Sequence, residues 1–155
     1  MKNEIYMPHK SSIGGLDANL TALLCYIASA IVSWVPVVCY VAWLAPRVRF
    51  FMEKESALVK FHAMQSFLLH AVNAALSLLV SVVLGGILSA SMYGAAGAYA
   101  AWGAAGIIGI LTTVISIVFL VFAIFAMVGA YRYQETYLPV VGGIARTLAD
   151  RIGQK

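Results

Sequence analysis

Apolar residues fill two long, uninterrupted stretches of this chain, and charged residues flank both. The first stretch runs from Leu20 to Ala45 and the second from Phe61 to Tyr131, and neither contains an Asp, Glu, Lys or Arg. A transmembrane helix needs about 20 consecutive apolar residues. The first stretch therefore accommodates one span and the second accommodates two or three, which predicts an all-α integral membrane protein.

We expect three transmembrane helices, at about 20–44, 61–88 and 107–130. The segment 89–106 is rich in Gly and Ala, which gain little from transfer into lipid, and its Tyr and Trp residues suit a membrane interface. We interpret this segment as an extracytoplasmic loop or a re-entrant hairpin. If it spans the membrane instead, the protein has four spans.

Helix breakers and amphipathic patterns predict the remaining segments. Pro8 and the Gly14–Gly15 pair interrupt residues 1–18, which we expect to be a flexible tail before a single membrane domain over 19–155. The stretch 47–56 mixes charged and aromatic residues, which is typical of an interfacial loop. After Pro139, apolar residues recur at helical spacing, which predicts an amphipathic helix along the membrane surface.

The basic residues predict the orientation, because Lys and Arg near the ends of spans tend to stay in the cytoplasm. Three spans place eight basic residues inside and two outside, whereas four spans place six inside and four outside. We therefore predict an outer N-terminus and an inner C-terminus. Seven of the inner residues should form an interfacial basic collar that binds anionic lipid headgroups. The basic collar comprises Arg47, Arg49, Lys54, Lys60, Arg132, Arg146 and Arg151. Because topology explains the net charge of +4, we expect no nucleic-acid partner.

Polar side chains form a stripe along one face of the second predicted span, at intervals close to one helical turn. Such groups are costly in hydrocarbon unless they meet a partner or water. The polar stripe therefore either packs against other spans through interhelical hydrogen bonds, which we expect for His62 and Asn73, or lines a hydrophilic path. The polar stripe comprises His62, Gln65, Ser66, His70, Asn73 and Ser77.

Catalytic and metal-binding patterns are missing from the sequence. The six acidic residues all flank the predicted spans, whereas coupled transporters usually keep an acid within the membrane. His62 and His70 are about 12 Å apart along a helix, which is too far to share one metal ion. We predict no enzymatic activity, no metal site and no cofactor.

Three stretches in order, 12–26, 59–66 and 129–142, resemble the bacterial Tic-twenty-like family of small membrane proteins. The most specific of them is Phe61-His-Ala-Met-Gln-Ser66. That family is related to the import component of the chloroplast inner envelope. The resemblance implies a bacterial inner-membrane location, three spans and a link to protein translocation or insertion.

These features predict a non-enzymatic membrane protein that acts by helix–helix association. Its partners would be other membrane proteins or a second copy of itself, and it would be an accessory subunit of a larger assembly. The alternative is a small channel or transporter lined by the polar stripe.

Overall fold

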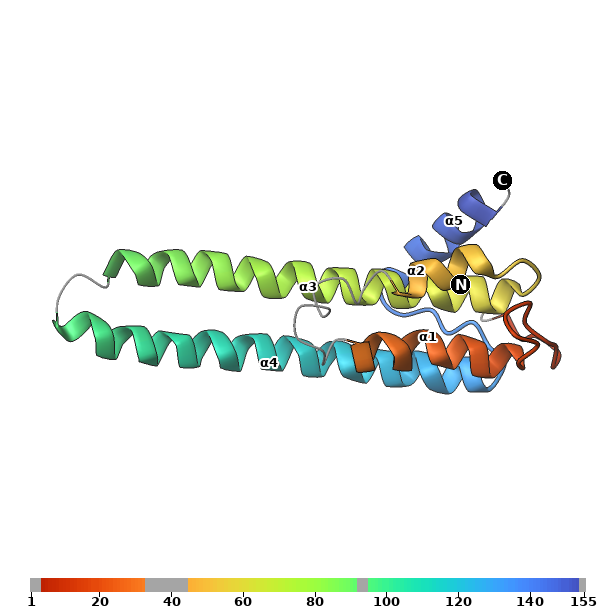
Figure 1. Cartoon of the computed structure of the whole chain (residues 1–155), viewed down its shortest axis with the longest axis horizontal. Helices are drawn as coiled ribbons and strands as arrows, with labels where there is room; N and C mark the ends of the chain where they lie inside the picture. The colour runs from red at the N-terminus through yellow and green to blue at the C-terminus, as the bar shows by residue number, and fades with distance from the viewer. Residues whose placement is uncertain (1–3, 33–44, 92–94, 154–155) are drawn as a thin grey trace. The chain divides into compact units, whose positions relative to one another are not determined.

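The computed structural model describes residues 4–32, 45–91 and 95–153 (Figure 1). The described residues form helices and contain no strand, which confirms the all-α prediction. Extended pairing among them is limited to two isolated bridges, between Ile5 and Gln134 and between Lys10 and Asp17. The helices are α1 (Ala18–Val32), α2 (Ala45–Met52), α3 (Ala57–Ser91), α4 (Ala95–Tyr131) and α5 (Val141–Gly153).

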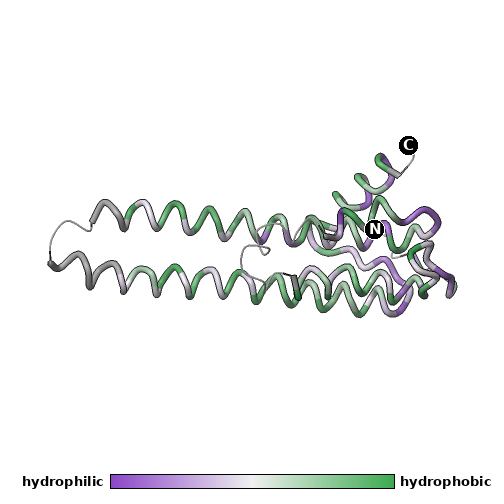
Figure 2. The backbone as a smooth tube through the Cα atoms, viewed as in Figure 1, coloured by the Kyte–Doolittle hydropathy of each residue, from purple (hydrophilic) through white to green (hydrophobic). Residues whose placement is uncertain are grey.

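Two of the helices are long and apolar enough to cross a membrane, over Ala57–Ile87 in α3 and Trp102–Tyr131 in α4 (Figure 2). Only 6% of the most apolar window of each is buried inside the chain, so over these windows the helices are not covered as a core helix of a soluble protein is. Trp102 and Tyr131, at the two ends of the second span, are exposed, as aromatic residues at membrane interfaces are. The predicted spans 61–88 and 107–130 fall on these two helices.

The predicted first span, 20–44, is described over its first part, as α1; residues 33–44 lie outside the described residues. The described parts of the chain therefore contain two candidate spans, and the prediction of three is not confirmed.

Two segments that we expected to be loops contain helix. Residues 95–106 belong to α4, because the alanines that make this segment weakly apolar are also the strongest helix formers. The interfacial stretch 47–56 contains most of α2, which places Pro46 in its first turn. Proline is favoured there, because the N–H groups of the first turn have no acceptor within the helix and the N–H that proline lacks is therefore not needed.

The chain divides into two compact units. Unit 1 comprises Met1–Ala71 and Val121–Lys155, and unit 2 comprises Val72–Leu120. In unit 2, the second part of α3 and the first part of α4 expose most of their large apolar side chains. The single domain over 19–155 and the flexibility of residues 1–18 stay predictions.

Two buried apolar clusters hold unit 1 together. The predicted C-terminal helix is present as α5, and it packs into unit 1 through Ala145 and Ala149 rather than standing apart from the protein. The first cluster joins α1, α2, α3 and α5 through Cys25, Phe50, Phe61, Ala63, Met64, Ala145 and Ala149. The second joins α1, α3 and α4 through Ala18, Ala22, Leu58, Val59 and Ala130.

Candidate functional site

His62, the first residue of the polar stripe, lies fully buried in unit 1. Its Nε2 lies 3.0 Å from the carbonyl oxygen of Gln134, and its Nδ1 lies 3.1 Å from the phenol oxygen of Tyr26. Because a carbonyl oxygen can only accept, Nε2 carries the proton and Nδ1 accepts the hydroxyl of Tyr26. Both ring nitrogens of His62 therefore have hydrogen-bond partners, one in α1 and one in the segment that follows α4.

Gln65 and Ser66 complete the buried half of the polar stripe. The Gln65 amide nitrogen donates to the Tyr26 hydroxyl oxygen at 3.3 Å and to the carbonyl of Thr136 at 3.0 Å. The Ser66 hydroxyl donates to the carbonyl of Cys25 at 3.1 Å. These side chains bind α1 and the segment that follows α4, so this half of the stripe ties three parts of unit 1 together.

The other half of the polar stripe makes fewer contacts. His70 Nδ1 lies 2.8 Å from the carbonyl oxygen of Ser66, one turn earlier on the same helix. The carbonyl of Ser77 accepts the hydroxyl of Ser81. The side-chain oxygen of Asn73 is buried and has no hydrogen-bond partner in the described part of the chain. That neighbouring spans satisfy Asn73 stays a prediction, since residues 33–44 of the predicted first span lie outside the described residues.

Our sequence-based predictions missed two buried carboxylates, of which Glu53 is the first. It lies between α2 and α3 and is 2% exposed. It accepts hydrogen bonds from the hydroxyls of Ser11 and Ser12 and from the backbone N–H groups of Ser12, Glu55 and Ser56. Burial alone would raise its pKa, but these hydrogen bonds outweigh burial and lower the pKa of Glu53 from 4.5 to about 2.

Glu135, the second buried carboxylate, lies in the segment between α4 and α5 and is fully buried. It accepts the hydroxyls of Tyr6, at 2.7 Å, and of Tyr137, at 3.1 Å, and it forms an ion pair with Arg146 of α5. Burial raises the pKa of Glu135 despite these partners. The carboxylate thus fixes α5 and the N-terminal segment to one point.

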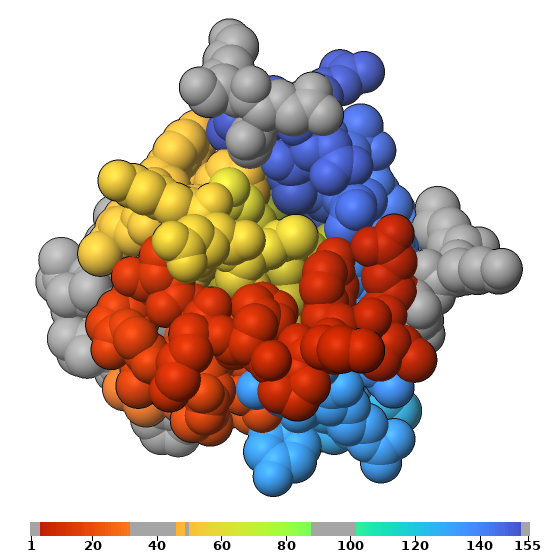
Figure 3. Space-filling view, turned by 90° about the vertical axis from the view of Figure 1, so that its right-hand side faces the viewer, coloured from red at the N-terminus to blue at the C-terminus, as the bar shows by residue number. Residues whose placement is uncertain are grey.

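The N-terminal segment also pairs with this region through its backbone. The N–H of Tyr6 donates to the carbonyl of Tyr133 at 2.8 Å, and the N–H of Glu135 donates to the carbonyl of Glu4 at 2.9 Å. Viewed from the end of the molecule, the N-terminal segment, in red, lies against the start of α3 and the segments near the C-terminus (Figure 3). We call residues 4–17, 53–56 and 132–140, together with Arg146, the polar cap.

The sequence signals for these carboxylates were weak. Each lies just outside an apolar stretch, where a charged residue is expected in any membrane protein. Ser56, three residues after Glu53, marks the start of α3, because its hydroxyl accepts the N–H of Val59 and caps the helix. This signal indicates a helix start and does not indicate a buried carboxylate. Glu135 has tyrosines on both sides in the sequence, which is the better clue, because a buried carboxylate needs donors.

The structure places the members of the basic collar in different settings. Arg146 is already paired with Glu4, Glu135 and Asp150. The Arg47 guanidinium lies 5.6 Å from the centre of the Phe67 ring, and Lys60 donates to the carbonyl of Lys54. The side chains of Lys54, Arg132 and Arg151 are exposed, and that of Arg49 lies outside the described part.

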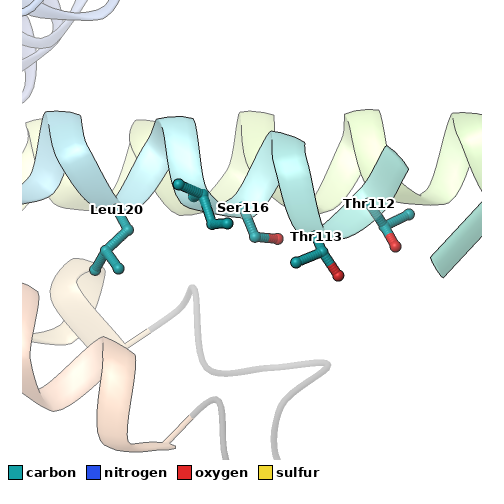
Figure 4. A pocket seen from close by; sticks show the side chains of 5 residues that line it. Thr112, Thr113, Ser116 and Leu120 are labelled. Carbon is teal, nitrogen blue, oxygen red and sulfur yellow. The ribbon is translucent and has the colours of Figure 1, made fainter. Parts of the chain in front are cut away.

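A shallow groove runs along α4 in unit 2 (Figure 4). The hydroxyls of Thr112 and Thr113 donate to carbonyls one turn earlier in the same helix, so they remain satisfied in an apolar surrounding. The groove is lined by Thr112, Thr113, Ser116, Ile117 and Leu120. Within the described residues, no three His, Cys, Asp or Glu side chains come together as a metal site would require.

Comparison with known proteins relates most of the chain to one family. Residues 17–145 match the magnetosome magnetite crystal formation protein family. This match corrects the resemblance to the Tic-twenty-like family, which relied on three short stretches of sequence. The link to protein translocation depended on that resemblance and has no support. Comparisons with curated proteins and with solved structures found no match.

Proposed function

Because this chain belongs to the magnetosome magnetite crystal formation protein family, we propose that it is a membrane protein that takes part in magnetosome formation without catalysing a reaction. It acts as an accessory subunit, by helix–helix association with other membrane proteins or with a second copy of itself. The observation that carries this proposal is the family match over 17–145, on a chain with two exposed, apolar helices.

The buried half of the polar stripe supports a structural role over a channel. His62, Gln65 and Ser66 are fully buried and direct their hydrogen bonds to α1 and to residues 132–140. Side chains that line a permeation path must instead be accessible to water or solute. The alternative of a small channel therefore rests on the other half of the stripe, His70, Asn73 and Ser77.

The groove on α4 supports helix–helix association. Membrane helices approach closely where side chains are small, and the groove includes Thr113 and Ser116. A Cβ atom added at Gly109, one turn before Thr113, would meet nothing within 4 Å. A neighbouring helix can therefore come near the backbone of α4 along this line.

The membrane surface is the second proposed partner, at the cytoplasmic face of a bacterial inner membrane. Anionic headgroups there would attract the exposed members of the basic collar, Lys54, Arg132 and Arg151, by about 1 kcal/mol for each residue near the surface. Arg146 contributes little to this attraction because its charge is already balanced by carboxylates.

Deletion of the gene in its host tests the proposed role, with the magnetite crystals measured by electron microscopy. We expect the deletion to change crystal size or number. The wild-type gene and a Val114→Leu control should restore the crystals, whereas Thr113→Leu/Ser116→Leu should restore them less, at equal protein levels. Unchanged crystals after deletion would contradict the proposed role. A separate measurement of ion flux through liposomes that contain the purified protein would favour the channel if the flux depended on Asn73.

A further inference from the structure

We infer that both termini of this chain lie on the cytoplasmic side of the membrane and that every charged residue lies there with them. Ionic partners then reach the protein from that side alone. The inference replaces the orientation with an outer N-terminus, and it does not depend on the proposed role in magnetosome formation.

The N-terminal segment is attached to the loop that precedes α3. The backbone N–H and the hydroxyl of Ser12 lie 3.1 and 2.7 Å from a carboxylate oxygen of Glu53. A hydrogen bond cannot join groups on opposite sides of a hydrocarbon layer about 30 Å thick. Three spans with an outer N-terminus would separate these residues in that way. Ser12 and Glu53 therefore share one side.

The same segment is also attached to the residues that follow α4. Tyr6 bonds Glu135 through its hydroxyl, and the backbones of residues 4–6 and 133–135 are paired. The start of α3 and the end of α4 thus lie on the same side as the N-terminus. Two spans that leave one face of the membrane and return to it have this arrangement.

The helices α1 and α2 both pack beside the first part of α3. Ala18 shares a buried cluster with Leu58 at the start of α3, and the carbonyl of Cys25 accepts the hydroxyl of Ser66 about two turns further along α3, so α1 runs beside α3 in the same direction. Phe50 of α2 packs in the cluster that contains Cys25. The chain thus enters α1 and leaves α2 on one side, and residues 18–52 make no net crossing.

The charge distribution identifies which side of the membrane this is. All ten Lys and Arg residues and all six acidic residues lie within residues 2–60 and 132–155. The arrangement places ten basic residues on one side and none on the other, a larger difference than the eight and two of the three-span orientation. The side with the basic residues is the cytoplasmic side. The opposite side receives the end of α3 and the start of α4, and no residue from Phe61 to Tyr131 is charged.

Accessibility labelling tests the orientation. In a Cys25→Ala/Cys39→Ala background, single cysteines at Met7, Lys54, Val140 and Ala96 react with a membrane-impermeant maleimide, before and after the inner membrane is opened. Met7 and Val140 are more than 80% exposed, which makes them suitable positions. We expect positions 7, 54 and 140 to react only after opening and position 96 to react before it. The inference would be overturned if position 7 reacted with the maleimide before the membrane is opened while position 54 did not. It would also be overturned if position 96 reacted only after opening.

A cross-link tests the N-terminal contact directly. Ile5 and Gln134 form the non-hydrogen-bonded pair of an antiparallel bridge, where Cα atoms are about 4.5 Å apart, within the range of a disulfide. Ile5→Cys/Gln134→Cys should therefore cross-link when isolated membranes are oxidised, whereas the control Ile5→Cys/Ala96→Cys should not. Absence of the 5–134 cross-link, although both cysteines react with a permeant maleimide, would overturn the inference. Neither readout depends on magnetite.

Discussion

The phenol oxygen of Tyr26 lies 3.1 Å from Nδ1 of His62, and it also accepts the amide of Gln65 at 3.3 Å. The two rings meet edge to face, with their centres 5.9 Å apart. Since Tyr26 belongs to α1 while His62 and Gln65 belong to α3, one hydroxyl links two helices at the centre of unit 1.

Tyr26→Phe should lower the stability of unit 1 by about 1 kcal/mol, because it removes both hydrogen bonds and leaves a buried His62 nitrogen without a donor. Thermal unfolding in detergent measures this loss. The control is Tyr131→Phe, since Tyr131 is exposed and should tolerate the change. Equal melting temperatures for the two variants would show that the hydroxyl contributes nothing.

Glu53→Gln should change how stability depends on pH. The folded-state pKa of Glu53, about 2, lies below its ordinary value of 4.5. Its ionised form therefore stabilises the fold above pH 4.5, and this contribution is lost as the pH falls toward 2. The variant should be less stable than wild type at pH 6 and should lose less stability between pH 4.5 and 2. Unfolding at several pH values, with Glu55→Gln as control, measures the difference.

Arg146→Met should destabilise the attachment of α5 by about 3 kcal/mol, because it leaves the fully buried Glu135 without its cation. Proteolysis of the C-terminal segment should become faster. Adding Glu135→Gln to this variant should recover part of the loss, since no buried charge then remains unpaired. Arg132→Met, at an exposed position, is the control, and it should leave the proteolysis rate unchanged.

Gly142→Ala should also loosen α5. An added Cβ would lie 2.8 Å from the Cα of Tyr137 and 3.0 Å from its carbonyl carbon, and a backbone cannot move aside as a side chain can. We expect a loss of about 1–3 kcal/mol, typical of overpacking. Gly109→Ala, where the new Cβ meets open space, should be neutral or slightly stabilising. The two variants are compared by thermal unfolding in detergent.

Asn73→Leu should leave the isolated protein as stable as wild type or more so, because the side-chain oxygen of Asn73 has no partner among the described residues. Its burial without a hydrogen bond costs free energy that leucine avoids. Denaturation in detergent gives the stability, and copurification from native membranes gives the partners. A loss of stability in the isolated protein would mean that Asn73 is satisfied within the chain.

The membrane helices could be predicted because their signal is local. The absence of charge between Phe61 and Tyr131 indicates the spans without any knowledge of tertiary contacts. The helix over 95–106 was not predicted. The small transfer energy of Ala and Gly into lipid indicated a loop, whereas the high helix propensity of Ala favours a helix. The extent of the first span could not be predicted. Whether a short apolar helix crosses the membrane depends on the tertiary contacts of its two ends.

The site was harder to predict because its contacts join distant parts of the chain. The polar stripe was visible from its periodicity, yet its partners were not: His62 bonds Gln134, 72 residues later. Glu53 and Glu135 have the sequence surroundings of ordinary surface acids, and only the fold surrounds them with donors. The family resemblance failed because it depended on short stretches, whereas the family match covers 17–145.

The long separation within the polar cap has a consequence for biosynthesis. Ser11 and Ser12 can bind Glu53 soon after α2 has been made, but Tyr6 is 129 residues from Glu135. Because the chain emerges N-terminus first, the second contact must wait until α3 and α4 have both been synthesised and inserted. Its formation therefore marks completed insertion. In the orientation that we infer, a chain that fails to insert one of the two helices leaves Glu135 on the opposite side of the membrane from Tyr6, so that the two cannot meet.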